Sequence, residues 1–401
     1  MLNTRPADAS DAVDGIAVSL VARPRSADEV AGALREARDE GLAVIPRGGG
    51  SKLSWGMPPR RADVVLDTSG LDRLLEHAAS DLVVRAEAGV RLAALQQSLA
   101  RHGQRLSLDP PEPGATLGGV AAAAASGPLR HRYGAPRDLL LGITVALSDG
   151  TLAKSGGKVV KNVAGYDLGK LFAGSLGTLG VIVELAFRLH PLPEAHAWTL
   201  LTLPSVDATA NAVLALLRSS LVPSAVELSW LHDGPVRLGV LFEGRAPGVA
   251  AQSQAAETLL APFGSAAGSS DVAFETAAVA AELLLQIAAP PADLAVVLES
   301  VRQAAQERRV SWHVSGRAGL GVLQAGFAGG DESSYADVVA QLRARLRPRG
   351  ASVVIRHAAV SLKRRADVFG DAGDALPLMR RVKESFDPDA TLSPGRFVGG
   401  L

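Results

Sequence analysis

The sequence contains no cysteine among its 401 residues. This absence excludes disulfides, cysteine nucleophiles, thiolate zinc sites and cysteine-held iron–sulfur clusters within the chain. An excess of charge of either sign is also missing, because lysine plus arginine equals aspartate plus glutamate at 41 each. That balance argues against nucleic acid or an anionic membrane surface as the main partner.

Long apolar runs are missing as well. No window approaches the ~18 uninterrupted apolar residues that a membrane helix needs. The first residues, MLNTRPADASDAVDG, carry acids and lack the apolar region of a signal peptide. We therefore expect no direct membrane insertion and a cytoplasmic location, either free or at a membrane through a complex. The eight histidines show no HExxH or similar spacing, so no metal site is predicted.

The sequence does contain enough hydrophobic residues to form a sizeable core, since 47% of its residues are hydrophobic and 20% are charged. This composition argues against disorder, and the length suits about two or three domains. Ser26-x-x-Glu29 is a capping-box pattern that predicts a helix through Glu40. A strand over 42–45 follows and runs into a loop of sequence PRGGGSK (46–52).

Three consecutive glycines directly after a strand make a loop almost without Cβ atoms, the form that a phosphate cradle takes. The alternative is a flexible surface turn. The spacing matches neither a Walker A loop nor the G-x-G-x-x-G of a Rossmann fold. A second glycine set, GSLGTLG (174–180), follows a helical pattern and opens a strand, which is the reverse of the Rossmann order, so it predicts no nicotinamide site.

The stretch 113–134 reads PGATLGGVAAAAASGPLRHRYG. Its alanine run favours helix, yet it offers no bulk to fill a core. A helix start of this kind lets backbone N–H groups approach a polyanion that lies flat against it. The alternative is a small-residue helix packed tightly on a sheet. Around this stretch the pattern predicts a helix over 90–101, a hairpin at Asp149-Gly150 and strands at 64–67, 82–88, 141–147, 151–154 and 181–189.

Taken together, these motifs resemble the FAD-binding domain of the vanillyl-alcohol-oxidase and p-cresol-methylhydroxylase (PCMH) type. The run KNVAGYDLGKLFAGSLGTLGVI (161–182), which follows RYGAPRDLLLG, is similar to the FAD-binding E subunit of bacterial glycolate oxidase. The resemblance implies an α+β protein: a PCMH-type FAD-binding domain of two α/β subdomains at 1–193 and a ferredoxin-like antiparallel cap domain at 194–385. A tail at 386–401 would return to the flavin, with Ser393 where the family has asparagine.

The resemblance also implies which residues hold FAD. The family's covalent tether is a histidine at the end of the glycine triplet; here that position is Ser51, so a noncovalent flavin is expected. For His102, His131 and His190 a structural role is preferred to a tether. The predicted cofactor-binding residues are Pro46, Arg47, Gly48, Gly49, Gly50, Ser51, Pro113, Thr116, Gly118, Gly119, Ser126, Gly127, Arg132, Tyr133, Gly134, Gly177, Thr178, Gly180, Ile182 and Arg396.

The second half alternates strands and helices in two rounds, which predicts an antiparallel sheet with helices on one face. Oxidation of a 2-hydroxy acid needs a cation for the carboxylate and a base for the hydroxyl proton. The candidates are His313, Arg317, Arg356, His357 and Lys363, each of which also suits a solvated or capping role.

Three functions remain open. The first is an FAD-carrying subunit of a glycolate oxidase complex, with a separate catalytic flavoprotein and an iron–sulfur subunit as partners. The second is a self-sufficient FAD-dependent 2-hydroxy acid dehydrogenase or oxidase. The third is a scaffold of the same fold without flavin.

Overall fold

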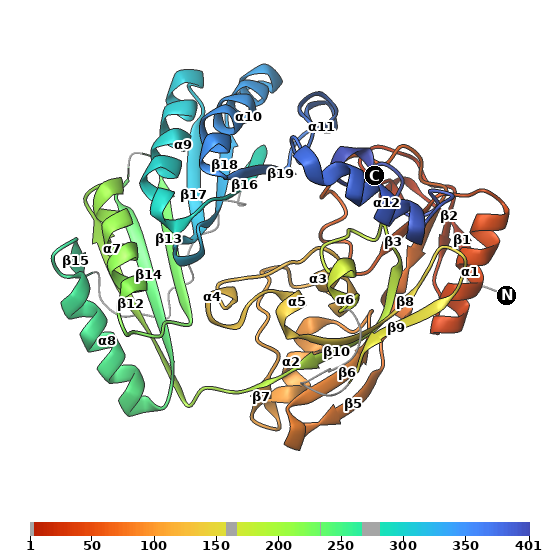
Figure 1. Ribbon diagram of the computed structural model, residues 1–401, viewed down its shortest axis with the longest axis horizontal. Coiled ribbons are helices and arrows are strands. Elements are labelled where there is room, and N and C mark those ends of the chain that lie inside the picture. Colours follow the sequence, from red (N-terminus) through yellow and green to blue (C-terminus); the bar gives the residue numbers. More distant parts are fainter. Residues whose placement is uncertain (1–3, 158–166, 233, 267–280) are drawn as a thin grey trace. The chain divides into compact units, whose positions relative to one another are not determined.

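The computed structural model describes residues 4–157, 167–232, 234–266 and 281–401. They form two compact units, and each is described here by itself (Figure 1). Unit 1 contains the chain up to Gly127, residues 133–192 and residues 371–401. Unit 2 contains residues 128–132 and 193–370. Residues 371–385, which the prediction assigned to the cap domain, therefore belong to unit 1 together with the tail.

Unit 1 begins with a four-stranded sheet of order β1-β2-β4-β3. Strands β2 and β3 run parallel to β4, and helix α1 makes the crossover that parallel strands require. The Ser26 side chain accepts a hydrogen bond from the Glu29 N–H, which caps α1 as predicted. The elements are β1 (Thr4–Pro6), β2 (Leu20–Ala22), α1 (Ala27–Asp39), β3 (Val44–Arg47) and β4 (Val64–Asp67).

A five-stranded antiparallel sheet of order β5-β6-β10-β8-β9 forms the second part of unit 1. The turn between β8 and β9 contains Asp149 and Gly150, and Gly150 has a φ of +78°, so the predicted hairpin is confirmed. The strands are β5 (Leu74–Ala78), β6 (Val83–Glu87), β8 (Leu140–Ala146), β9 (Leu152–Gly156) and β10 (Val181–Arg188).

Helices pack on these sheets in two of the apolar cores of unit 1. In the first, Val30 and Leu34 of α1 pack against Leu66 of the four-stranded sheet and Val183 of the five-stranded sheet. In the second, helices α2 (Leu92–Ala100) and α3 (Leu117–Ala122) pack on the five-stranded sheet, with Leu99 and Leu117 fully buried. The α1 helix thus joins the two sheets of unit 1 through one continuous core.

Helix α3 is shorter than the alanine run predicted. It ends at Ala122, and Ala124 adopts a left-handed φ of +48°. The carbonyl oxygens of Ala121 and Ala122 accept hydrogen bonds from the N–H groups of Gly174 and Leu176. Tertiary contacts with the second glycine set therefore override the helix propensity of alanine here.

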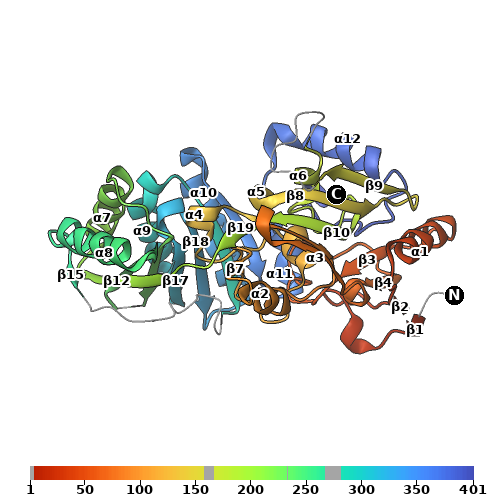
Figure 2. The same cartoon turned by 90° about the horizontal axis from the view of Figure 1, so that it is seen from below.

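The remaining elements of unit 1 are short apart from α12 (Figures 1 and 2). Phe386 at the end of α12 packs edge-on against Phe172 of α6, with ring centroids 5.5 Å apart. The elements are β7 (Gln104–Arg105), α5 (Pro136–Leu139), α6 (Gly169–Phe172), β11 (His190–Pro191), α12 (Leu376–Phe386) and the 3₁₀ helices η1 (Ala9–Asp11), η2 (Thr68–Gly70), η3 (Ala79–Asp81), η7 (Gly373–Ala375) and η8 (Val398–Gly400). Helix α4 (Arg130–Tyr133) begins in the segment that belongs to unit 2.

Unit 2 is an eight-stranded antiparallel sheet of order β15-β12-β14-β13-β17-β18-β16-β19. Its chain order is strand-helix-strand-strand-helix-strand, twice. Numbered within each round, the strand order is 4-1-3-2 followed by 2-3-1-4, so two ferredoxin-like halves meet at the β13–β17 pair. The predicted ferredoxin-like α+β cap is confirmed and is found to be double.

The first half consists of β12 (Ala195–Leu203), α7 (Val206–Arg218), β13 (Ala225–Leu231), β14 (Val236–Gly244), α8 (Ala246–Leu260) and β15 (Ser265–Ala266). The second consists of β16 (Leu283–Ala288), η4 (Pro291–Asp293), α9 (Leu294–Arg308), β17 (Ser311–Arg317), η5 (Ala318–Leu320), β18 (Val322–Ala328), α10 (Glu332–Leu346), η6 (Arg347–Arg349) and β19 (Ser352–His357), followed by α11 (Val360–Ala366). Helices α7, α8 and α9 lie on the same side of strands β12 and β17 (Figure 2). In the described parts of the chain, no helix is long and apolar enough to span a membrane.

Candidate functional site

Unit 1 contains a cavity with about 870 Å³ of empty space, part of which is open to solvent. Three glycine-containing segments and one arginine of the C-terminal tail line it. Of the predicted cofactor-binding residues, thirteen are in the lining: Pro46, Arg47, Gly48, Gly49, Gly50, Ser51, Thr116, Gly118, Gly119, Gly177, Gly180, Ile182 and Arg396.

The glycine triplet forms a wall of this cavity that packs closely on the second segment. A Cβ atom at Gly48 would overlap the Thr116 hydroxyl, and one at Gly49 would overlap the Gly114 carbonyl oxygen. Gly50 has a φ of +75°, a backbone conformation that favours glycine. Within the described residues, the N–H groups of Gly49, Gly50 and Ser51 donate to no backbone carbonyl. This loop therefore offers free donors for an anion.

The second segment, which contains Gly118 and Gly119, packs closely on its neighbours and does not supply free N–H donors from these two glycines. The N–H of Gly118 donates to the Ala88 carbonyl, and the N–H of Gly119 donates to the Thr116 hydroxyl that caps α3. A Cβ at Gly118 would lie 2.7 Å from the Ala88 Cβ. The N–H groups of these two glycines are therefore not free to bind a polyanion, because the packing and capping of α3 use them.

The third segment is held in place by a buried ion pair. Lys383 of α12 donates hydrogen bonds from its Nζ to the carbonyl oxygen of Thr178 at 2.7 Å, to that of Leu392 at 2.8 Å, and to the Asp387 carboxylate at 2.5 Å. Asp387 also accepts the N–H groups of Thr391 and Leu392. One ammonium group thus joins the loop that carries Gly177 and Gly180 to the C-terminal tail.

Arg396 brings the tail into the cavity wall. Its guanidinium Nη2 donates to the carbonyl oxygens of Leu53 and Trp55, both at 2.6 Å. Its Nη1 is buried and has no partner among the described residues. The residue is 3% exposed, and burial lowers its pKa from the usual value. A buried cationic donor left unsatisfied in a cavity lining is a position that an anionic ligand would satisfy.

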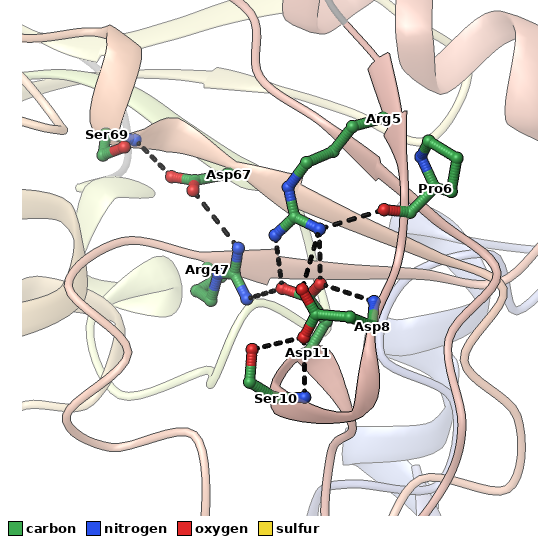
Figure 3. Close-up of polar contacts among 8 residues, drawn as sticks. All are labelled: Arg5, Pro6, Asp8, Ser10, Asp11, Arg47, Asp67 and Ser69. Carbon is green, nitrogen blue, oxygen red and sulfur yellow. Dashed lines mark hydrogen bonds and ion pairs between the residues drawn. The ribbon is translucent and has the colours of Figure 1, made fainter.

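Arg47 has a different role from the one that its position in the glycine loop suggests. Its guanidinium donates to Asp11 at 2.8 Å and to Asp67 at 3.3 Å (Figure 3). Arg5 binds the same Asp11 carboxylate through two hydrogen bonds of 2.7 and 2.9 Å. The Arg5 guanidinium, together with Arg47, holds the pKa of Asp11 well below its usual range. The cluster fixes the start of the glycine loop on the N-terminal segment.

The other seven predicted residues lie outside the lining. Pro113 is exposed, and Thr178 donates its hydroxyl hydrogen to the Ser175 carbonyl. Gly127 donates its N–H to Asp109, and Ser126 precedes it. Arg132 belongs to unit 2, where it donates to the Glu243 carbonyl at 3.5 Å. Tyr133 accepts a hydrogen bond from Arg105, and Gly134 has a φ of +86° beside Asp138.

The histidines judged structural have packing partners. His102 meets His77 edge-on, and His190 contacts Ser107 through Nδ1 and the ring of Tyr133. His131, in the part of α4 that belongs to unit 2, lies against Gly319, and burial lowers its pKa.

The candidate catalytic residues of unit 2 are not brought together. His313 and Arg317 lie on β17, whereas Arg356 and His357 lie on β19, three strand spacings or about 14 Å away across the sheet. His313 Nε2 contacts the Ser229 hydroxyl at 3.0 Å, and Arg356 donates to Gln286. Burial lowers the pKa of Arg356 to about 10, so it stays charged at neutral pH. Lys363 is buried in α11. Among the described residues, no group of three or more histidines and acids is placed to hold a metal ion.

The cavity of unit 1 fits a dinucleotide with a pyrophosphate. The glycine loop leaves no room for side chains, free N–H groups line one wall, and Arg396, whose buried Nη1 is unsatisfied, belongs to the lining. Sequence reasoning missed several lining residues, including Lys52, Thr68 and Glu112. Thr68 follows a strand with no motif of its own, and no local signal pointed to it.

Comparison with known proteins agrees with this geometry. Residues 18–156 match the model of the FAD binding domain, and residues 248–397 match that of the C-terminal domain of FAD linked oxidases. The chain belongs to this family of FAD-linked oxidases of the PCMH type. It is an FAD-dependent oxidoreductase, and FAD is its cofactor. The proposed tether-free binding stays a prediction.

Relatives of known activity align along the chain to different extents. The D-lactate dehydrogenase of Archaeoglobus fulgidus is 29% identical, over 95% of this chain and 92% of that protein. A D-2-hydroxyglutarate dehydrogenase of Xanthomonas citri is 28% identical, over 94% and 88%. The glycolate oxidase subunit GlcD of Bacillus subtilis is 31% identical over 52% of this chain, and that match spans 44% of the subunit.

Among solved structures, an alkyldihydroxyacetonephosphate synthase superimposes with a TM-score of 0.72 over 94% of this chain and 77% of that one. The identity is 18%, so this likeness establishes the fold alone.

Proposed function

We propose that the protein is the FAD-binding subunit of a glycolate oxidase, a complex that oxidises glycolate to glyoxylate. A catalytic flavoprotein subunit and an iron–sulfur subunit would be its partners. Two electrons and two protons leave the substrate at the catalytic subunit, and the FAD bound by this chain would accept the electrons from that subunit and pass them on within the complex. The chain has no cysteine to hold a cluster itself, so electron exit requires another chain or a diffusible acceptor.

The observation that carries this proposal is the contrast between the two units. The cavity of unit 1 gathers glycines, free N–H groups and Arg396 into one site. In unit 2, His313 and Arg317 are separated from Arg356 and His357 by two intervening strands. A cofactor-holding role needs the first arrangement and does not need a catalytic constellation in the second.

A second candidate is a self-sufficient FAD-dependent 2-hydroxy acid dehydrogenase. The match to the archaeal D-lactate dehydrogenase, which spans nearly the whole of both chains, favours it. In that case Arg317, which is buried on β17, and Arg356 on β19 would be candidate cations for a substrate carboxylate.

An anaerobic absorbance titration separates the two. The purified chain is reconstituted with FAD, and its flavin spectrum is recorded before and after glycolate or D-lactate is added. Flavin bands that persist, and that bleach when the partner subunits are added, support the subunit role. Bleaching of the isolated chain by either acid contradicts it and makes Arg317 and Arg356 the first residues to substitute.

A further inference from the structure

Glu112 has an unusual position in the FAD cavity. Its side chain lines the same space as the glycine loop and Arg396. Among the described residues that line this cavity, it is the one acidic side chain. A carboxylate would repel the pyrophosphate of the cofactor, so its presence in the lining calls for another role.

The two oxygens of this carboxylate have different surroundings. Oε1 accepts a hydrogen bond from the ammonium group of Lys52, which also lines the cavity and stands 4.1 Å over the ring of Trp55. Oε2 is buried and has no donor among the described residues. A buried acceptor without a donor is costly, and in a ligand site it indicates a donor on the ligand.

The ion pair also removes the electrostatic objection. Lys52 compensates the charge of Glu112, so the remaining oxygen acts as an acceptor rather than as an exposed negative charge. FAD carries hydroxyl donors on both sides of its pyrophosphate, on the ribose of the adenosine half and on the ribityl chain of the flavin half. We propose that Glu112 recognises FAD by accepting a hydrogen bond from one of these sugar hydroxyls through Oε2. This inference rests on FAD as cofactor and is independent of the substrate.

The test compares the FAD affinity of Glu112 variants. If Glu112 accepts a hydrogen bond from FAD, its removal weakens binding. If its carboxylate only repels the pyrophosphate, its removal tightens binding. FAD is titrated into apoprotein while quenching of flavin fluorescence is followed. Glu112→Ala removes the acceptor and should weaken binding about 10- to 100-fold, as loss of a charged hydrogen bond does. Glu112→Gln keeps an amide oxygen that accepts, so it should retain most of the affinity. Tighter binding in both variants, or unchanged affinity in Glu112→Ala, would overturn the proposal.

The effect of Lys52 on FAD affinity has to be controlled, because substitution of Glu112 leaves the Lys52 ammonium group without its carboxylate near the pyrophosphate. The comparison is therefore repeated in a Lys52→Met background, where the same order of affinities is expected. Glu36→Ala removes an exposed glutamate from α1 of the same unit and should leave FAD affinity unchanged. Thermal unfolding of each apoprotein shows that the variants fold; if a double variant fails to fold, the single Glu112 variants carry the test.

Fragments of the cofactor locate the hydroxyl. ADP carries the ribose, FMN carries the ribityl chain, and inorganic pyrophosphate carries neither, so each is used to compete with FAD. A loss of affinity in Glu112→Ala that is shared with ADP assigns the ribose, and one shared with FMN assigns the ribityl chain. An equal loss for inorganic pyrophosphate would overturn the proposal, because that probe has no hydroxyl to recognise.

Discussion

The buried pair of Lys383 and Asp387 makes the sharpest prediction about what holds the cavity together. The Lys383 side chain is 9% exposed and that of Asp387 is fully buried. Lys383→Met leaves the Asp387 carboxylate without its counterion, although the N–H groups of Thr391 and Leu392 still reach it. Breaking a buried ion pair by removing one partner costs about 3–5 kcal/mol.

The assay is urea and thermal unfolding of the apoprotein. For a unit of this size, about 2–4 °C is lost per kcal/mol, so Lys383→Met should lower the melting temperature by about 6 to 20 °C. Lys383 also donates to the Thr178 carbonyl, so Lys383→Met should weaken FAD binding as well as lower the stability. A titration with FAD well below the melting temperature measures the effect on binding in the folded protein. Lys383→Met with Asp387→Asn should recover part of the stability, since no buried charge then remains.

A matched control lies on the same tail. Arg38 of α1 pairs with Asp389 at 2.7 Å, but both side chains are about half exposed. Arg38→Met should therefore change the free energy of unfolding far less than Lys383→Met. If the two variants lose equal stability, or if Lys383→Met keeps full FAD affinity, the reasoning about the buried pair is refuted.

Three further predictions concern the cavity and its supports. Arg396→Met should weaken FAD binding about 10- to 100-fold, because it removes the cationic donor that has no protein partner; unchanged affinity in a titration would contradict this. Gly49→Ala should abolish FAD retention by pushing the glycine loop off the Gly114 carbonyl, whereas Gly32→Ala, on an open face of α1, should be neutral or mildly stabilising. The lowered pKa of Asp11 contributes stability that is fully present above pH about 4 and is lost progressively as the pH falls further, so Asp11→Asn should destabilise most at pH 7 and by a steadily smaller amount as the pH is lowered below 4 in urea unfolding.

Local chemistry made much of the fold predictable. Ser26 caps α1, Asp149-Gly150 turns the hairpin, and the glycine triplet follows β3, because each depends on neighbours within a few residues. The two rounds of strands and helices in the second half also predicted the α+β cap. The strands β1 and β2 had no such signal, since each spans only three residues, which is too few to show a periodic pattern.

The sequence predicted the glycines that line the cavity, but only some of the hydrogen bonds and ion pairs of the charged residues around it. Arg47, placed by motif beside a phosphate, is engaged by Asp11 from 36 residues away. Lys383 lies in ordinary polar sequence, and Glu112 directly precedes the predicted stretch 113–134, but the residue type of neither marked it as part of the site. Their importance comes from burial and from partners distant in the chain.

The sequence by itself determined the cofactor class through a resemblance to FAD-binding domains, which is carried by the order of its glycine motifs. Only the tertiary structure decided which backbone N–H groups remain free and that Arg396 Nη1 is buried without a partner among the described residues. It also decided that the candidate catalytic residues of unit 2 lie on separate strands. The physical reason is that hydrogen-bond partners and burial are set by contacts between distant segments, and a linear pattern does not encode those contacts.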